Sequence, residues 1–300
     1  MKQRSGRKIW KRIVVGIIFY VLLVVGIGLL LSPWLEASVI ERAGRQYTSV
    51  GFSQEQLAAN TAAREGFEID PDITIPELPE ILTNLPDINQ DDVIGVVSID
   101  SVGVFLPIFH GATGVNLLAG AGTMYSDQVM GEGNYPLAGH HMWDASLLFG
   151  PLLDVQIGDW IQLTDRQNLY TYQVTNTELI HQNTVEILEH TEEPTVTLFT
   201  CDVSNSATNN RWVVQGELID VSPLDITIDS NGKLILQPEN RGNPYLITFQ
   251  TMNNIVIERA ENHLIWRWII IISGISFVTL ATGMFLFSRI ERRYQYIKRG

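Results

Sequence analysis

The chain has 300 residues, 45% of them hydrophobic, and a formal net charge of −13 at pH 7. The first 12 and last 12 residues hold eleven of the 20 Lys and Arg and one of the 33 Asp and Glu, so the segment between them carries a charge of about −23. Because such an acidic surface repels phosphate backbones, we expect no nucleic-acid partner.

Two uncharged apolar runs lie just inside the basic ends. Residues 13–31 and 268–287 are each long enough to cross about 30 Å of hydrocarbon. We expect both to be transmembrane helices, and their basic flanks place both termini in the cytoplasm and the chain between them outside. The alternatives are a cleaved signal peptide for the first run, although no clear small-x-small cleavage site follows it, and a buried core helix for the second.

Composition changes along the chain define the expected parts. The segment after the first apolar run is polar and then carries four prolines, which is typical of a stalk and an extended linker. The parts are a cytoplasmic basic tail (1–12), an N-terminal transmembrane anchor (13–32), an extracellular stalk and Pro-rich linker (33–92), a β-rich domain (93–221), an extracellular extension (222–263), a C-terminal transmembrane helix (264–288) and a second cytoplasmic basic tail (289–300).

Short β-type runs separated by turn residues characterise residues 93–221. They are VIGVVSI, VFLPIFH, NYPLAGHH, DWIQLTD, LYTYQVTNTELIH, TVTLFTC and RWVVQGELI. No long amphipathic helix interrupts them, which predicts a mainly β antiparallel barrel or sandwich. The segment after Asp220 has further β-prone stretches, which either add strands beside this domain or lead back to the membrane.

The only cysteine, Cys201, ends the run TVTLFTC. A solitary cysteine in an exported domain is either a small buried hydrophobe or a free thiol kept for its reactivity. An unperturbed thiol is mostly protonated at pH 7, so a nucleophilic cysteine needs a histidine or a cation beside it. The candidates are His140, some sixty residues earlier, for proton transfer, and Arg211, ten residues later, as a fixed positive charge.

The runs NYPLAGHH and TLFTCD…RWVVQGEL resemble the signature of sortases, membrane-anchored cysteine transpeptidases of Gram-positive bacteria. The resemblance covers about residues 93–219 and is closest to class A. It implies a mainly β fold, a closed sortase-type barrel of about eight strands with short helices, which the two transmembrane α-helices expected from the apolar runs would flank. It implies that Cys201 is the nucleophile, His140 the general acid/base, Arg211 the oxyanion and substrate clamp, and Thr200 an auxiliary hydroxyl.

His141 has the same chemistry as its neighbour His140. Neighbouring side chains on a strand point to opposite faces, so we expect only one of the two to face Cys201, and the motif assigns this role to His140. The resemblance also implies an apolar substrate groove, although each of its residues could equally belong to the barrel core. The groove residues are Leu117, Ala138, Phe199 and Val213, with Val185, Ile187 and Leu188 on a specificity loop.

The implied reaction cleaves an LPXTG-like sorting signal between Thr and Gly through a thioacyl-enzyme and transfers the protein to a cell-wall precursor amine. The implied partners are LPXTG-bearing surface proteins or pilins, the peptidoglycan precursor and the lipid bilayer. The alternatives are a pilin-polymerising sortase that uses a pilin Lys amine, a hydrolytic cysteine peptidase and an inactive sortase-like binding module. A second span favours the pilin-polymerising class, but Asp70-Pro71-Asp72 does not match that class's Asp-Pro-aromatic lid.

We expect no cofactor and no metal site. Some sortases bind calcium through carboxylates, and calcium requires several converging oxygen atoms. The acidic residues that could contribute here are Asp127, Glu132, Glu186 and Glu189. On so acidic a domain, a solvated surface is the favoured interpretation of these side chains.

Overall fold

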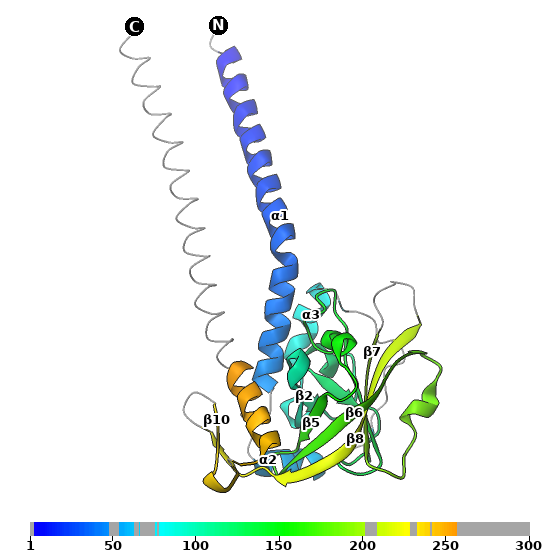
Figure 1. The fold of residues 1–300 in the computed structure, drawn as a ribbon. Coiled ribbons are helices and arrows are strands. Elements are labelled where there is room, and N and C mark those ends of the chain that lie inside the picture. The colour runs from blue at the N-terminus through cyan, green and yellow to red at the C-terminus, as the bar shows by residue number, and fades with distance from the viewer. Residues whose placement is uncertain are drawn as a thin grey trace. The chain divides into compact units, whose positions relative to one another are not determined.

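The computed structural model describes residues 3–47, 54–62, 66, 76, 78–201, 209–228, 233–240 and 242–256. Eight strands form a closed barrel in the order β1-β2-β3-β4-β7-β8-β6-β5. Figure 1 labels several of them in the ribbon. They are β1 (Val93–Ile99), β2 (Val104–Phe109), β3 (Ala121–Thr123), β4 (Asn134–Ala138), β5 (Trp160–Thr164), β6 (Asn168–His181), β7 (Thr195–Cys201) and β8 (Asn210–Pro223). The mainly β closed barrel predicted from the sequence is confirmed.

Two strand pairs in the barrel are parallel, which the expected antiparallel arrangement did not include. β2 pairs with β3 and β4 pairs with β7 in parallel, and the other barrel pairs are antiparallel. A parallel pair requires a connection long enough to return the chain to the same end. The connection between β2 and β3, which includes the short helix η5 (Asn116–Leu118), and the long chain between β4 and β7 meet that requirement.

The remaining turns and short helices connect these strands. They are η4 (Asp100–Val102), η6 (Gly150–Asp154) and η7 (Val185–Leu188). The barrel interior is filled by aliphatic and aromatic side chains that include Tyr135, Phe149 and Tyr172. β1 is buried along its whole length because one face lines this interior and the elements outside the barrel cover the other.

Three N-terminal helices contribute to the cover. They are α1 (Gln3–Tyr47), α2 (Gln54–Ala62) and α3 (Leu78–Asn84), followed by η2 (Leu85–Asp87) and η3 (Gln90–Asp92). Ile40, Leu57 and Ile81 from the three helices share one buried apolar cluster with Phe109 of β2. The Asn60 side chain also donates a buried hydrogen bond of 2.8 Å to the backbone oxygen of Val93. Described parts of the segment expected as stalk and linker, 33–92, therefore belong to the folded body.

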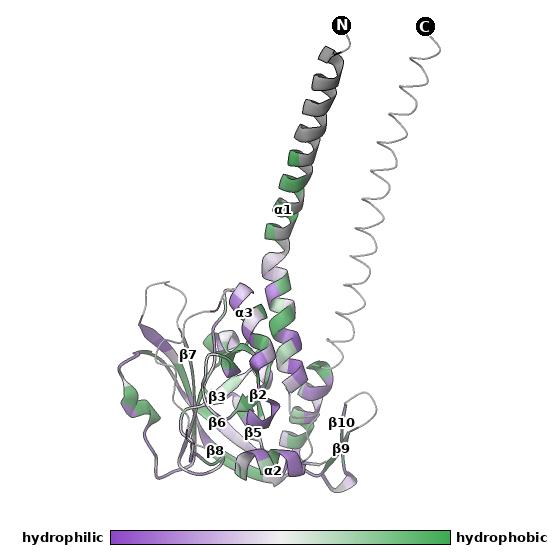
Figure 2. Cartoon of the chain, turned by 180° about the vertical axis from the view of Figure 1, so that it is seen from behind, coloured by the Kyte–Doolittle hydropathy of each residue, from purple (hydrophilic) through white to green (hydrophobic). Residues whose placement is uncertain are grey.

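The first apolar run of the sequence lies within α1. Several of its large hydrophobic side chains are exposed, up to 81% for Leu30. Figure 2 colours part of α1 as hydrophobic. Among the described residues, no single helix has the length and hydropathy of a membrane span, while the bent pair Val21–Ile27 and Ser32–Tyr47, at 46°, has them jointly. The second expected span, 268–287, lies outside the described residues.

The chain after β8 returns to the barrel. β9 (Ile226–Ile228) and β10 (Leu234–Leu236) form a separate two-stranded sheet, η8 (Pro238–Asn240) follows, and residues 244–256 are helical. The Phe249 ring of this helix lies 5.6 Å from the Phe105 ring of β2, and the backbone oxygen of Tyr245 accepts a 2.8 Å hydrogen bond from Gln162 of β5. The described part of the expected extension thus adds a strand pair and a packed helix beside the barrel.

Candidate active site

Cys201 and Arg211 are cross-strand partners at one end of the barrel. β7 ends at Cys201, β8 starts one residue before Arg211, and the antiparallel register sets the two directly opposite each other. Directly opposite residues project to the same face with Cβ atoms about 5 Å apart. The guanidinium donates hydrogen bonds to the Asn210 backbone oxygen (3.1 Å) and the Gln182 side-chain oxygen (3.3 Å). No sequence motif points to Gln182 as a partner of Arg211.

The thiol of Cys201 is free and partly buried. Burial raises the pKa of this thiol, and the positive charge of Arg211 acts in the opposite direction. Because the effect of burial is the larger, the resting site holds a protonated thiol at neutral pH. Nucleophilic attack from this residue therefore requires a base that accepts the proton.

The segment that follows β4 lies against the end of β7. We call residues 139–149 the histidine loop. β4 and β7 run in parallel with Ala138 beside Phe199, and the Gly139 amide continues the ladder with a 3.2 Å bond to the Phe199 oxygen. The buried Thr200 hydroxyl donates a 2.8 Å hydrogen bond to the Gly139 oxygen. Continuing this register brings the backbone of His140 level with Cys201.

His140 is a buried, neutral imidazole. It is 2% exposed, and burial lowers its pKa to about 4. A neutral imidazole at pH 7 can accept a proton from a thiol. Its Nδ1 atom is buried and has no hydrogen-bond partner within the described ranges of the chain.

His141 also adjoins Cys201. Its Nδ1 lies 3.1 Å from the backbone oxygen of Cys201, and the residue forms an isolated bridge with Leu148 across the histidine loop. The two histidines do not lie on a strand, because β4 ends at Ala138, so strand alternation does not separate their side chains. The acid/base role of His140 stays a prediction, and His141 is placed to hold the backbone of the cysteine.

Gly139 explains why the motif needs a glycine before the histidines. A Cβ atom at this position would lie 2.5 Å from the ring of Phe149, far below van der Waals contact. Phe149 itself is fully buried, and its amide donates a 3.0 Å hydrogen bond to the His140 oxygen. The ring thus occupies the space of the missing side chain and closes the histidine loop on itself.

The residues expected in the substrate groove fall into two groups. Leu117, Ala138 and Phe199 share a small apolar cluster, and Val213 lies opposite Phe199 on β8. All of this group except Phe199 are buried, and their role as a groove stays a prediction. On η7, Val185 is exposed while Ile187 and Leu188 are half-buried. Two hydrogen bonds hold η7 against β4: the Asn134 side chain donates to the backbone oxygens of Ile187 (2.9 Å) and Glu189 (3.0 Å).

The four acidic candidates for a metal site belong to no metal-holding group among the described residues. Across the ranges that the structure describes, no three His, Cys, Asp or Glu side chains are grouped so that they could hold a metal ion. The candidates from the sequence, Asp127, Glu132, Glu186 and Glu189, are all among the residues searched.

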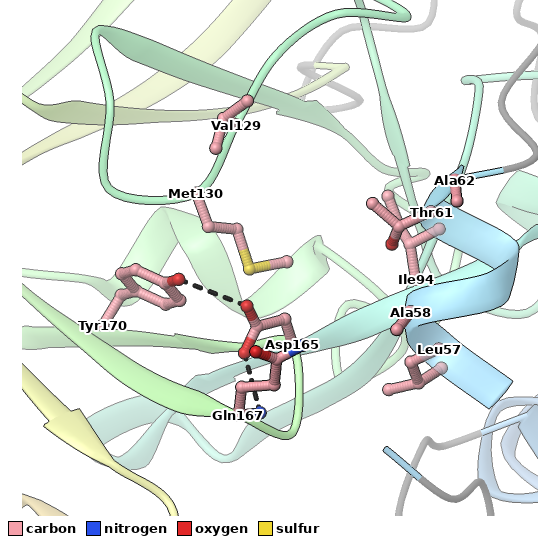
Figure 3. A pocket seen from close by; sticks show the side chains of 10 residues that line it. All are labelled: Leu57, Ala58, Thr61, Ala62, Ile94, Val129, Met130, Asp165, Gln167 and Tyr170. Carbon is pink, nitrogen blue, oxygen red and sulfur yellow. Dashed lines mark hydrogen bonds between the residues drawn. The ribbon is translucent and has the colours of Figure 1, made fainter. Parts of the chain in front are cut away.

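A separate hollow of about 240 Å³ lies between α2 and the barrel, and it includes none of the site residues above (Figure 3). Leu57, Ala58, Thr61, Ala62, Ile94, Val129, Met130, Asp165, Gln167 and Tyr170 line it. The carboxylate of Asp165 in this hollow accepts hydrogen bonds from the Tyr170 hydroxyl (3.2 Å) and the Gln167 backbone amide (2.9 Å). The polar groups of this hollow thus mainly serve a local turn.

Comparisons with known proteins agree on one family. The family model described as Sortase domain matches residues 97–219. Sortase A of Listeria monocytogenes is 38% identical over 198 residues, which cover 66% of this chain and 88% of that protein. Sortase A of Bacillus anthracis is 32% identical over 209 residues, with 70% and 96% covered. The chain belongs to the sortase family.

Solved sortase structures are similar as well. The crystal structure of Listeria monocytogenes sortase A is 50% identical, covers 45% of this chain and 92% of its own, and has a TM-score of 0.44. Sortase C-3 of Streptococcus pneumoniae is 20% identical, covers 67% and 96%, and has a TM-score of 0.49. As a sortase, the protein belongs to a family of transpeptidases.

Proposed function

We propose that this sortase cleaves an LPXTG-like sorting signal between Thr and Gly through a thioacyl intermediate on Cys201. The pairing of Cys201 with Arg211 across the β7–β8 ladder, beside the histidine loop, is the observation that supports it best. In the first step the imidazole of His140 accepts the thiol proton and the sulfur bonds to the Thr carbonyl carbon. The C–N bond to Gly then breaks, and the departing amine receives that proton.

The second step reverses the proton flow. The amine of a cell-wall precursor loses a proton to the same imidazole and attacks the thioester carbon. The C–S bond breaks, a new amide forms, and the thiol recovers its proton. In both steps negative charge develops on the carbonyl oxygen, and the guanidinium of Arg211 is the cation on the thiol's side of the sheet. No other group has to change its protonation state.

The test of this proposal is mass spectrometry of the full-length chain in detergent with an LPXTG peptide, with and without an amine. We expect a peptide thioester on Cys201 and an amine-dependent ligation product. Cys201→Ala and His140→Ala should abolish both, whereas His190→Ala, at an exposed histidine, should keep both. His141→Ala should weaken acylation only in part, because it loses one bond to the Cys201 backbone. The reverse order for the two neighbouring histidines would move the acid/base role to His141.

Pilin polymerisation is the alternative with the same chemistry. The apolar run 268–287, which a basic tail follows, favours it, because a second span is more typical of pilin-polymerising sortases. Two acceptors separate the possibilities in the same assay: a glycine-type amine that imitates a cell-wall precursor and the side-chain amine of a lysine peptide. Preferential use of the lysine side chain would support pilin polymerisation and contradict a cell-wall role.

We further propose that the enzyme is anchored by two membrane spans, with both termini in the cytoplasm and the barrel outside. The exposed hydrophobic side chains of α1 and the basic ends of the chain support this topology. Because Cys201 is the only cysteine, a membrane-impermeant thiol reagent reports its side of the membrane directly. We expect labelling of Cys201 in intact cells. Labelling that occurs only after lysis would contradict the topology.

A further inference from the structure

One face of α1 packs on the barrel beside the proposed site. Ile40, Ala43 and Tyr47 are spaced three and four residues apart, so they form a single stripe, and all three are buried. Gly44 lies within the stripe, and a Cβ atom there would be only 3.0 Å from the backbone oxygen of Ala119, next to η5. The last turns of α1 therefore rest directly on the backbone of the barrel body.

The histidine loop belongs to the same packed region. Met142, Leu147 and Leu148 are buried in the apolar cluster that also contains Ile40 and Tyr47 of α1. Met142 directly follows the two histidines, so its packing bears on the backbone that carries them. The cluster makes the stripe on α1 and the histidine loop parts of one continuous core.

A charge interaction between Glu36 of α1 and Asp144 of the histidine loop also indicates that the two segments lie close together. Glu36 lies one turn before Ile40, on the same side of the helix. Burial and the nearby carboxylate of Asp144 both raise the pKa of Glu36. Asp144 is in the middle of the histidine loop, so α1 and the loop approach each other over both apolar and charged residues.

The histidine loop contains a strained residue, Leu148. Leu148 has a φ of +51°, a left-handed conformation that is strained for a bulky side chain and persists only where the surroundings impose it. Its bridge partner is His141. A catalytic base is usually oriented by a third hydrogen-bonding group. The buried Nδ1 of His140 has no such partner in the described part of the chain.

We propose that the stripe of Ile40, Ala43 and Tyr47 on α1 is a positioning surface for the histidine loop, so that the packing of this helix sets how fast His140 exchanges protons with Cys201. The stripe touches no substrate and acts through Met142 and Leu148. This inference rests on the proposed thioacyl chemistry, and its test includes a measurement that does not need turnover.

The test compares Ile40→Ala with Leu246→Ala in the full-length chain in detergent. Both residues are 1% exposed and lose the same number of carbon atoms, but Leu246 lies on the helix 244–256, outside the cluster of the histidine loop. Two quantities are measured: the single-turnover rate constant of thioester formation with an LPXTG peptide, over a series of peptide concentrations, and deuterium exchange of residues 140–150.

We expect Ile40→Ala to lower the rate constant by about 10-fold to 100-fold, the usual effect of a small misplacement of a catalytic group. The peptide concentration for half-saturation should change by less than about 2-fold, because ground-state binding is retained. Exchange over residues 140–150 should become faster. Ile40→Val should keep the rate constant and the exchange close to those of the unmodified protein, and Leu246→Ala should alter neither quantity.

Equal effects of Ile40→Ala and Leu246→Ala on the rate constant, or unchanged exchange in the histidine loop, would overturn the inference. A change in half-saturation alone would also overturn it. If Ile40→Ala does not fold, Gly44→Ala carries the same test, since its new Cβ pushes α1 away from Ala119. If the unmodified protein forms no thioester, the proposed function fails, and the exchange data alone decide whether α1 holds the loop.

Discussion

The burial of His140 predicts that the protein loses stability in mild acid. Its pKa is about 4 in the folded chain and about 6.5 when the chain is unfolded. Between these values the unfolded chain binds more protons, so stability rises with pH, and the contribution present above pH 6.5 is lost as the pH falls toward 4. The difference between the two pKa values corresponds to about 3 kcal/mol, and most of it is lost between pH 7.5 and 4.5.

The assay is urea unfolding of the full-length chain in detergent, followed by tryptophan fluorescence at pH 7.5 and 4.5, for the unmodified protein and His140→Gln. Acidic residues also titrate in this range, but they do so in both proteins, and the comparison cancels them. We expect the unmodified protein to lose about 2–3 kcal/mol more than His140→Gln. An identical loss in both proteins would show that burial does not keep the His140 imidazole neutral. The assignment of His140 as the base would then lose this support.

Three further changes test the geometry of the site. Gly139→Ala places a Cβ 2.5 Å from the ring of Phe149 and should destabilise the protein by about 1–3 kcal/mol, seen in urea unfolding; unchanged stability would show that the ring can move aside. Thr200→Val leaves the buried Gly139 oxygen without its donor and should cost about 1–3 kcal/mol in the same measurement, whereas a neutral result would mean that the bond contributes nothing net. Arg211→Gln removes the charge that lowers the pKa of Cys201, so the pH profile of alkylation by iodoacetamide should move to higher pH. A profile that moves to lower pH or stays in place would refute this electrostatic role of Arg211.

The barrel was largely readable from the sequence because its strands are uninterrupted β-type runs. VIGVVSI and TVTLFTC coincide with β1 and β7 residue for residue. The parallel pairs were not readable, because no local pattern distinguishes β3, with three residues, from a turn. The packing of α2 and α3 was missed for a similar reason. Each helix attaches through few buried side chains, such as Leu57 and Ile81, and one such residue produces no periodic pattern.

The site was partly readable. The motif located Cys201, Arg211 and the histidines. The structure adds that the β7–β8 register aligns Cys201 with Arg211 and that the parallel β4–β7 pair places the histidine loop beside Cys201. The burial of His140 and the contact of His141 with the cysteine backbone follow from the end of β4 at Ala138, which the alternation argument assumed to lie later. The link from α1 to the histidine loop was not readable, because it joins residues about a hundred positions apart.

The packing of α1 also determines how far the enzyme can reach. Ile40 is anchored in the barrel body, and the apolar run of the same helix ends about ten residues earlier, which is about 15 Å of helix. Under the proposed topology, this part of α1 is a short helical connection, which we call the stem, rather than a long flexible linker. The thiol would then work within a narrow layer above the bilayer, and substrates would be selected in part by presenting their signal at that height. Lengthening the stem by whole helical turns would raise that layer in steps, with the barrel itself unchanged.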